Sequence, residues 1–185
     1  MNILIDAGHG GSDPGTIGFG RTEADLNLAD AHMLKACILY HRPKANVVIT
    51  RDSNKTLDRI TRKAIILSRK WDMFCCIHHN AGGGHGFESY ISRDPSYADR
   101  WIQGEIHRRL QPHFLEYRIK DRGPKQLNFW VLVSNTVPEI FLEMGFMDSS
   151  YDMSWMVSSG VKQQLLRTIA EVLINACEHK TMGKT

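Results

Sequence analysis

The sequence has no long apolar run, since no stretch in it reaches the roughly 18 apolar residues that a membrane-spanning helix needs. It also has no internal repeat and no low-complexity segment, and its 42% hydrophobic and 23% charged residues are typical of a folded globular protein. The formal net charge is only +3 and is spread along the chain, which does not indicate a nucleic-acid partner. We therefore expect a globular protein that binds no nucleic acid and inserts into no membrane.

Cysteine is scarce, and its spacing excludes a disulfide framework and a cysteine-based metal site. There are four cysteines, of which two are adjacent in an apolar run and two fall in helical patterns. No pair has the CxxC-like spacing that cysteine metal ligands commonly use. We predict that all four are free thiols: Cys37, Cys75, Cys76 and Cys177.

The pattern of an export signal and that of an interdomain linker are also missing. Met1 is followed almost at once by a strand-like run, which leaves no room for a signal peptide. The 185 residues suit one domain. We expect a single domain over residues 1–180 that is synthesised in the cytoplasm, unless the chain is a piece of a longer exported protein.

Apolar periodicity alternates between strand and helix, which predicts an α/β domain of three layers, α/β/α, around a mostly parallel sheet of about six strands. Thr22 is placed to cap the first helix. The predicted strands are Asn2 to Asp6, Val47 to Thr50, Met73 to His78, Phe87 to Ile91, Phe129 to Val133 and Ile140 to Glu143. The predicted helices are Glu23 to about Tyr40, Leu57 to Trp71, Tyr97 to His113 and Val161 to about Cys177.

Titratable side chains lie where three predicted strands end. His9 follows ILIDAG, His78 follows FCCI, and Glu143 lies within EIFLEMGF. Glu23 begins the helix after the first strand, so all four are placed to converge at the carboxyl edge of the sheet. Two histidines and a carboxylate are a common catalytic zinc set, and a further carboxylate serves as the base. The glycines around His9 allow a sharp turn and a close approach of the backbone.

Each of these residues also has an ordinary structural interpretation. A lone histidine at a strand end more often makes a hydrogen bond or faces solvent, and Glu23 alone would favour the dipole of a first helical turn. Glu143 is harder to explain in this way, because a buried carboxylate needs a partner or a task. Glu88 faces either solvent or the crevice. We predict that four other histidines lie at the surface: His79, His85, His107 and His113.

Several segments, taken in order, resemble the zinc-dependent N-acetylmuramoyl-L-alanine amidases of the amidase-3 family, which hydrolyse peptidoglycan. They extend from residue 3 to about residue 148, and the closing helix is compatible with the family. Cys76 stands where the family often has a small polar residue, a change that a buried strand tolerates. The resemblance implies a phosphorylase/hydrolase-like fold. The segments are LIDAGHGGSDPGTIG, TEADLNLA, VVITRDS, CIHHNA, GFESY, DRGPKQLNFWVL and PEIFLEMGF.

The resemblance implies that His9, Glu23 and His78 bind one Zn²⁺ per chain and that Glu143 is the catalytic residue. The implied substrate is peptidoglycan, as a muramyl peptide, cleaved between the lactyl group of N-acetylmuramic acid and the L-alanine of the stem peptide. Zinc would then lower the pKa of a bound water, while Glu143 passes a proton to the leaving amine.

Six further residues are candidates for supporting roles. Asn80 is a candidate for a substrate hydrogen bond near the metal, and Glu88 is a second candidate on that side of the sheet. Asp6 or Asn27 would orient the metal ligands by hydrogen bonding to them, without binding the metal itself. The last two are cations that could meet substrate carboxylates, although such charges are more often solvated or salt-bridged: Arg51 and Lys125.

The biological setting and two other functions stay open at this point. Cellular members of the family commonly carry an export signal and a wall-binding module, and neither pattern is present, which favours a phage endolysin that acts on the bacterial wall at lysis. The main alternative is the catalytic domain of a secreted or periplasmic protein. No inserted helix interrupts the segments, so we expect activity without an activator. The other functions are a zinc peptidase of different bond specificity and a non-catalytic peptidoglycan-binding domain.

Overall fold

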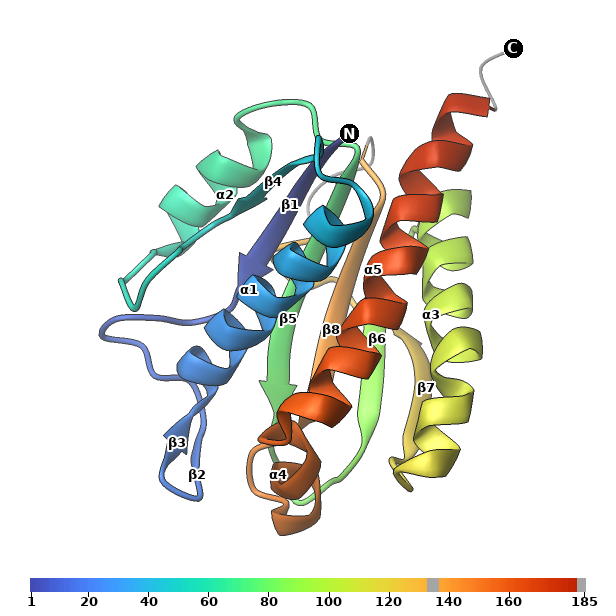
Figure 1. Ribbon diagram of the computed structural model, residues 1–185. Helices are drawn as coiled ribbons and strands as arrows, with labels where there is room; N and C mark the ends of the chain where they lie inside the picture. Colours follow the sequence, from blue (N-terminus) through green and yellow to red (C-terminus); the bar gives the residue numbers. More distant parts are fainter. Residues whose placement is uncertain (133–136, 183–185) are drawn as a thin grey trace.

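A six-stranded sheet forms the centre of the computed structural model, which describes residues 1–132 and 137–182. Its strand order is β4-β1-β5-β8-β6-β7 (Figure 1). The first four are parallel to one another, whereas β6 is antiparallel to β8 and parallel to β7. A short hairpin of β2 (Ile17–Gly18) and β3 (Arg21–Thr22) stands apart. The sheet strands are β1 (Asn2–Ala7), β4 (Asn46–Ile49), β5 (Met73–Asn80), β6 (Phe87–Ile91), β7 (Asp121–Gln126) and β8 (Glu139–Phe146).

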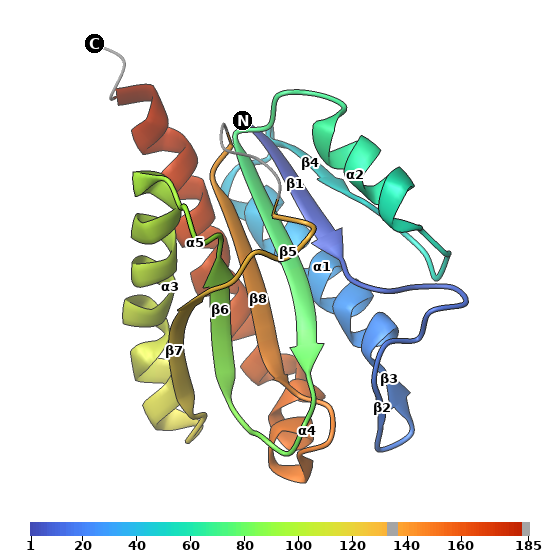
Figure 2. The same ribbon diagram turned by 180° about the vertical axis from the view of Figure 1, so that it is seen from behind.

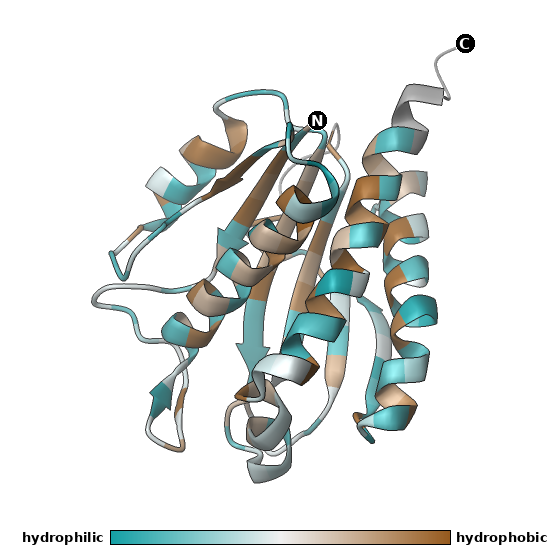
Figure 3. Cartoon of the chain, viewed as in Figure 1, coloured by the Kyte–Doolittle hydropathy of each residue, from teal (hydrophilic) through white to brown (hydrophobic). Residues whose placement is uncertain are grey.

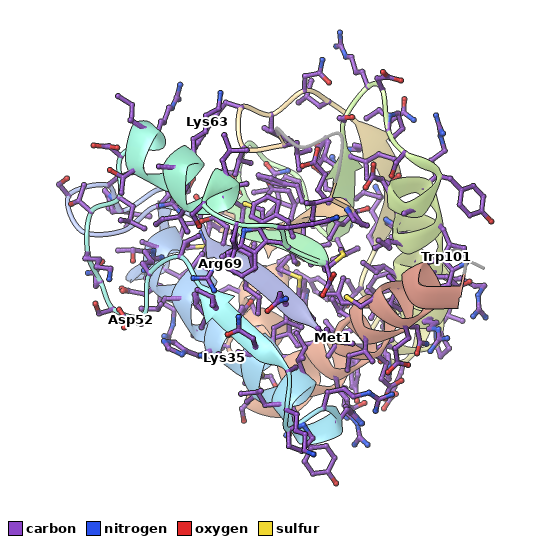
Figure 4. All side chains as sticks on the ribbon, turned by 90° about the horizontal axis from the view of Figure 1, so that it is seen from above. Met1, Lys35, Asp52, Lys63, Arg69 and Trp101 are labelled. Atoms are coloured by element: carbon purple, nitrogen blue, oxygen red, sulfur yellow. The ribbon has the colours of Figure 1, made fainter. Side chains whose placement is uncertain are left out.

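The helices cover the two faces of the sheet unequally. Three of them, α1, α3 and α5, lie side by side on one face, with α4 at the end of α5 (Figure 1). Among the described residues, α2 and the segment 127–132 lie over the other face, as Figures 2 and 4 show. The expected three layers are confirmed, and the second of the helical layers is thin. The helices are α1 (Glu23–His41), α2 (Arg59–Leu67), α3 (Tyr97–Glu116), α4 (Ser150–Met156) and α5 (Ser159–Met182).

Successive side chains of a strand point to opposite faces, and this alternation assigns the residues of β5 to two cores. Cys75 and Ile77 enter the larger core beneath α1, α3 and α5. Phe74 and Cys76 enter the smaller core on the side of α2. His78 therefore lies on the thinly covered face. Figure 3 shows β1 and β5 apolar for most of their length and hydrophilic at their carboxyl ends.

The same alternation brings two acidic residues to that face. Phe141 of β8 belongs to the smaller core, and Glu143 follows it by two positions. Glu88 of β6 is the register partner of Glu143, so both carboxyl groups lie on one face of neighbouring strands. The thin layer leaves this end of the sheet open.

Most predicted elements are present, with boundaries that differ by a few residues. The predicted cap of the first helix is confirmed, because the Thr22 hydroxyl accepts a hydrogen bond from the Asp25 backbone N–H at 3.1 Å. The second helix is shorter than predicted: it begins at Arg59, because Asp58 caps it by accepting from the Thr61 backbone N–H at 2.7 Å, and it ends at Leu67. The pattern did not indicate α4, which Ser149 caps through the Asp152 N–H.

The strand predicted at Phe129 to Val133 is wrong for the described residues. The segment up to Leu132 turns back on itself, with the Leu132 N–H donating to the Phe129 carbonyl at 3.1 Å, and Val133 lies outside the described residues. The sixth strand is instead β7, which is polar because it is an edge strand with one neighbour. Pro124 is tolerated there for the same reason.

Two further expectations can be compared directly with the described part of the chain. None of the four cysteines forms a disulfide, as predicted. No helix within the described ranges combines the length and the apolar character needed to cross a membrane.

A charged cluster is buried between α1, α5 and β5. Asp30 of α1 is completely buried and forms an ion pair with Lys162 of α5, which is only 6% exposed. The Nε2 atom of His79 lies 3.4 Å from Asp30 Oδ2. His79 was predicted at the surface and is 2% exposed, because the alternation of β5 points it toward α1. His107 is likewise buried, between Ser89 and Asp121.

Removing one partner of this ion pair is expected to destabilise the fold. Lys162→Met leaves the Asp30 carboxylate buried without its cation, so the free energy of unfolding should fall by about 3 kcal/mol in urea denaturation. As a control, Arg167→Met on the exposed side of α5 should change it by less than about 0.5 kcal/mol. The double variant with Asp30→Leu should recover much of the loss. A loss below about 1 kcal/mol in the single variant would contradict this account.

Candidate metal centre and cleft

Three predicted side chains meet where β1 and β5 end. Glu23 Oε1 lies 3.1 Å from His9 Nε2 and 2.8 Å from His78 Nδ1. One donor atom from each of the three lies within 4.8 Å of the others, and the two imidazole rings meet edge to face with centroids 4.9 Å apart. Two nitrogens and an oxygen in this arrangement form a donor set that could hold a metal ion.

His9 is held in an uncommon backbone conformation. Its φ of 58° lies in the left-handed region, which residues other than glycine rarely adopt. Asp13 Oδ2 lies 2.9 Å from His9 Nδ1, and Arg62 donates to the His9 carbonyl at 3.0 Å. These contacts fix the ring with Nε2 toward Glu23. The sequence interpretation missed Asp13, whose signal was an acid four residues after the histidine.

Two glycines leave room for the ligand side chains themselves. A Cβ atom at Gly8 would lie 2.2 Å from the His78 ring, and one at Gly15 would lie 2.7 Å from both Glu23 Oε2 and the His9 ring. Neither distance is tolerable for a carbon atom, so the close grouping of the three side chains requires glycine at both positions.

The charge of Glu23 is stabilised by its two neighbours. Burial by itself would raise the pKa of Glu23, but hydrogen bonds to His78 and His9 outweigh it and hold the pKa far below the usual range. Burial would lower the pKa of His9, yet Glu23 and Asp13 together raise it. The trio is therefore an anionic carboxylate between two imidazoles. A divalent cation would bind to the same oxygen and nitrogen atoms.

The buried carboxyl group of Glu143 lies next to this trio. It is 9% exposed, it is the register partner of His78, and its Oε2 atom has no hydrogen-bond partner among the described residues. Burial, followed by the negative charges of Glu23 and Glu88, raises the pKa of Glu143 well above its ordinary value. A carboxyl group tuned in this way is suited to exchanging a proton with a reacting group.

A cleft of about 380 Å³ lies in front of these groups. Its lining comes from the end of β1 and the loop after it, from β5 and β8, from α2 with the preceding Leu57, and from the segment 127–132. Phe141 forms part of the floor, where it stacks on the His78 ring with centroids 4.7 Å apart. The lining residues are Asp6, Gly8, His9, Asp13, Leu57, Arg59, Arg62, His78, Phe129, Trp130, Val131, Phe141 and Glu143.

Asn27 contacts the trio directly. Its Nδ2 atom donates to Glu23 Oε1 at 3.3 Å and to the Gly8 carbonyl at 3.2 Å. Its Oδ1 atom lies 2.8 Å from His79 Nδ1, which leads to the buried Asp30. This geometry suits the orienting role predicted for Asn27.

Asp6 contacts no member of the trio. Its carboxylate accepts from the Thr50 hydroxyl at 2.7 Å and from the Cys76 thiol at 3.2 Å, and it pairs with Arg62. Since Arg62 donates to the His9 carbonyl, Asp6 reaches the site only through that arginine.

Arg51 does not face a substrate, and this prediction is wrong. The side chain is completely buried, and its guanidinium donates to the backbone carbonyls of Ala7, Gly8 and Ala24 at 2.7–3.0 Å. It therefore ties the loop before His9 to the start of α1.

Glu88 contacts two of the other residues that were candidates for supporting roles. It faces the same side as Glu143 and is 1% exposed. It accepts from Asn80 Nδ2 and from the Tyr90 hydroxyl, each at 2.6 Å, and it pairs with Lys125. Arg122 completes this group. In this structure Asn80 and Lys125 therefore bind Glu88 and not a member of the trio.

Comparison with known proteins gives a consistent result. The sequence profile of the family described as N-acetylmuramoyl-L-alanine amidase matches residues 3–175. A sporulation-specific N-acetylmuramoyl-L-alanine amidase of Bacillus subtilis is 34% identical over 176 residues, which are 95% of this chain and 68% of that protein. An endolysin of Bacillus phage SPP1 is 32% identical over 172 residues, or 91% of this chain and 62% of the endolysin.

A solved structure is similar over nearly the whole chain. It is the catalytic domain of CwlV, an N-acetylmuramoyl-L-alanine amidase from Bacillus (Paenibacillus) polymyxa var. colistinus. The TM-score is 0.82 at 28% identity, and the match covers 94% of this chain and 96% of that domain.

The raised pKa of Glu143 predicts how stability depends on pH. The native state keeps this proton above pH 4.5, the ordinary value at which the unfolded chain loses it, so the free energy of unfolding falls as the pH rises. In protein stripped of metal by a chelator, Glu143→Gln should therefore raise the melting temperature at pH 7 and leave it unchanged at pH 4. Glu105→Gln, where arginines lower the pKa to about 2, should give no gain at pH 7. Equal effects of Glu143→Gln at both pH values would contradict the assignment.

Proposed function

The chain belongs to the N-acetylmuramoyl-L-alanine amidase family, and on that premise we propose that it is a zinc-dependent peptidoglycan hydrolase that cleaves one particular amide. This amide joins the lactyl group of N-acetylmuramic acid to the L-alanine of the stem peptide. The observation that carries the proposal is the grouping of His9, Glu23 and His78 with the buried Glu143 carboxyl group at one cleft.

The donor set fits zinc. Zn²⁺ commonly takes histidine nitrogens and carboxylate oxygens at about 2.0–2.2 Å, so tetrahedral ligand atoms lie roughly 3.3 Å apart. The 2.8 and 3.1 Å separations of the Glu23 oxygen from the two histidine nitrogens are close to that value. Three protein ligands leave a position for water or substrate. When bound, the metal would polarise the scissile carbonyl and lower the pKa of a water molecule.

Glu143 is the residue that moves the proton. Its Oε2 atom has no partner among the described residues, so it is free to accept a proton from the attacking water. It then donates this proton to the nitrogen of the leaving L-alanine, whose departure breaks the amide. The raised pKa of Glu143 makes it a stronger base than an exposed glutamate and a competent acid afterwards.

The remaining residues position these groups. The Asn27 amide holds Glu23 Oε1, Asp13 holds the His9 ring, and Phe141 stacks on the His78 ring. Phe141 and Phe129 are themselves stacked, with ring centroids 4.3 Å apart, and both add apolar surface to the lining of the cleft. Excluding water there strengthens the electrostatic interactions of the reacting groups.

The proposal extends to the setting in which the enzyme acts. The substrate lies in the bacterial wall, and the similarity to a phage endolysin supports a lytic role for a protein synthesised in the cytoplasm. We propose that residues 1–180 form one catalytic domain that needs no activator. A different zinc peptidase activity, or binding without cleavage, remains an outcome that product analysis distinguishes.

Digestion of purified peptidoglycan tests both the bond and the base. The zinc-loaded protein should release peptides with a free N-terminal alanine, detected by mass, and leave the glycan strands uncut. Glu143→Gln should lower kcat by about 10²–10⁴-fold because the proton transfer is lost, with metal content unchanged. Glu105→Gln on α3 serves as the control and should keep full activity. Full activity in Glu143→Gln would refute the assigned base, and cleavage elsewhere would refute the assigned bond.

Metal affinity tests the role of Asn27. Asn27→Ala removes the amide that orients Glu23, and the loss of such a contact typically weakens metal binding by about 10–100-fold. Competition with a chromophoric chelator measures this directly. Asn80→Ala, whose amide binds Glu88 instead, should leave the zinc affinity within about twofold of the wild type. Equal losses in the two variants would show that Asn27 has no specific role.

A further inference from the structure

Arg59 and Trp130 line the same cleft as the reactive groups. Both line the same cavity as His9 and Glu143, although they come from different parts of the chain. Arg59 is the first residue of α2, and Trp130 lies in the segment 127–132, so the pair joins the two pieces that cover this face of the sheet.

The two arginines of the cleft differ in their partners. Arg62 is 3% exposed and is committed to Asp6 and to two backbone carbonyls. Arg59 is exposed and forms no ion pair with a carboxylate anywhere in the described part of the chain. It is therefore the cation of the cleft wall that is available to a ligand.

Trp130 contacts the guanidinium of Arg59. The guanidinium carbon lies 5.4 Å from the centroid of the indole ring, within the range of a cation–π interaction. A guanidinium held through its face keeps the N–H groups of its edge free for hydrogen bonds. Trp130 is 39% exposed, so this pair stands at the border between the cleft and solvent.

We propose that Arg59, held by Trp130, binds a carboxylate of the stem peptide and so selects among substrates. The planar guanidinium matches a carboxylate in a bidentate arrangement. The inference rests on the proposed function, which places the scissile amide beside Glu143 and the stem peptide in the cleft. The nearest anionic group of such a peptide is the α-carboxylate of a glutamate that follows L-alanine, and a substrate with a carboxamide there lacks the charge.

Two matched substrates test this directly. They are synthetic muramyl dipeptides that differ only in the α-carboxylate or α-carboxamide of the second residue. The wild-type enzyme should show a kcat/KM about tenfold higher for the carboxylate, as expected for a charge-assisted bidentate contact, and the preference should weaken with added salt. Arg59→Gln should abolish the preference, because kcat/KM for the carboxylate should fall to the level of the carboxamide.

Three further variants separate the charge from its geometry. Arg59→Lys keeps the charge without the planar fork and should retain only part of the preference. Trp130→Leu removes the stacking partner and should reduce the preference with Arg59 intact. Lys44→Gln removes one positive charge just before β4 begins, whereas the cleft lies where the parallel strands end. This variant should retain the full preference.

The outcomes distinguish this inference from the proposed function. If the wild type cleaves neither muramyl peptide, the proposed function fails. If it cleaves both peptides at the same rate, or if Arg59→Gln retains the preference, the amidase assignment stands and the role of Arg59 is refuted.

Discussion

The buried carboxylate of Glu23 is the constraint around which the site is built. A carboxylate out of water costs several kcal/mol unless it is paired and hydrogen-bonded, and Glu23 is 4% exposed. Its oxygens are satisfied by His9, His78, the Asn27 amide and the backbone N–H of Thr16. The loop after β1, the start of α1 and the end of β5 are thereby joined at one point, and the same requirement explains the glycines beside them.

The sheet supplies the second condition, which is an open face. Because α1, α3 and α5 all lie on one side, the other side is covered, in the part of the chain that the structure describes, by α2 and the segment 127–132 alone. Alternation along the strands then places His78, Glu143 and Glu88 on that thinly covered side. The cleft lies on this side, and it is lined by the reactive groups together with Arg59 and Trp130.

Predictions made from the sequence succeeded where the signal was local and failed where it was not. The apolar run of β5 and the capped start of α1 need no partner to be identified. The strand β7 was missed because an edge strand carries no apolar alternation, and the apolar residues near Phe129 were taken for a strand although they cover a sheet face. Arg51 and His79 were misplaced for a similar reason, because their partners come from elements distant in the sequence.

The sequence by itself determined the family, the α/β class and the four residues at the centre of the site. It could do so because strand ends, helix starts and short motifs are local features of the chain. Only the tertiary structure decided which side chains share a face, which cations are already paired and which remain available. These properties depend on the distance between groups far apart in the chain: Arg51 is bound by carbonyls of β1 and α1, Lys125 by Glu88, and Arg59 alone among these three faces the cleft without a carboxylate partner in the part of the chain described.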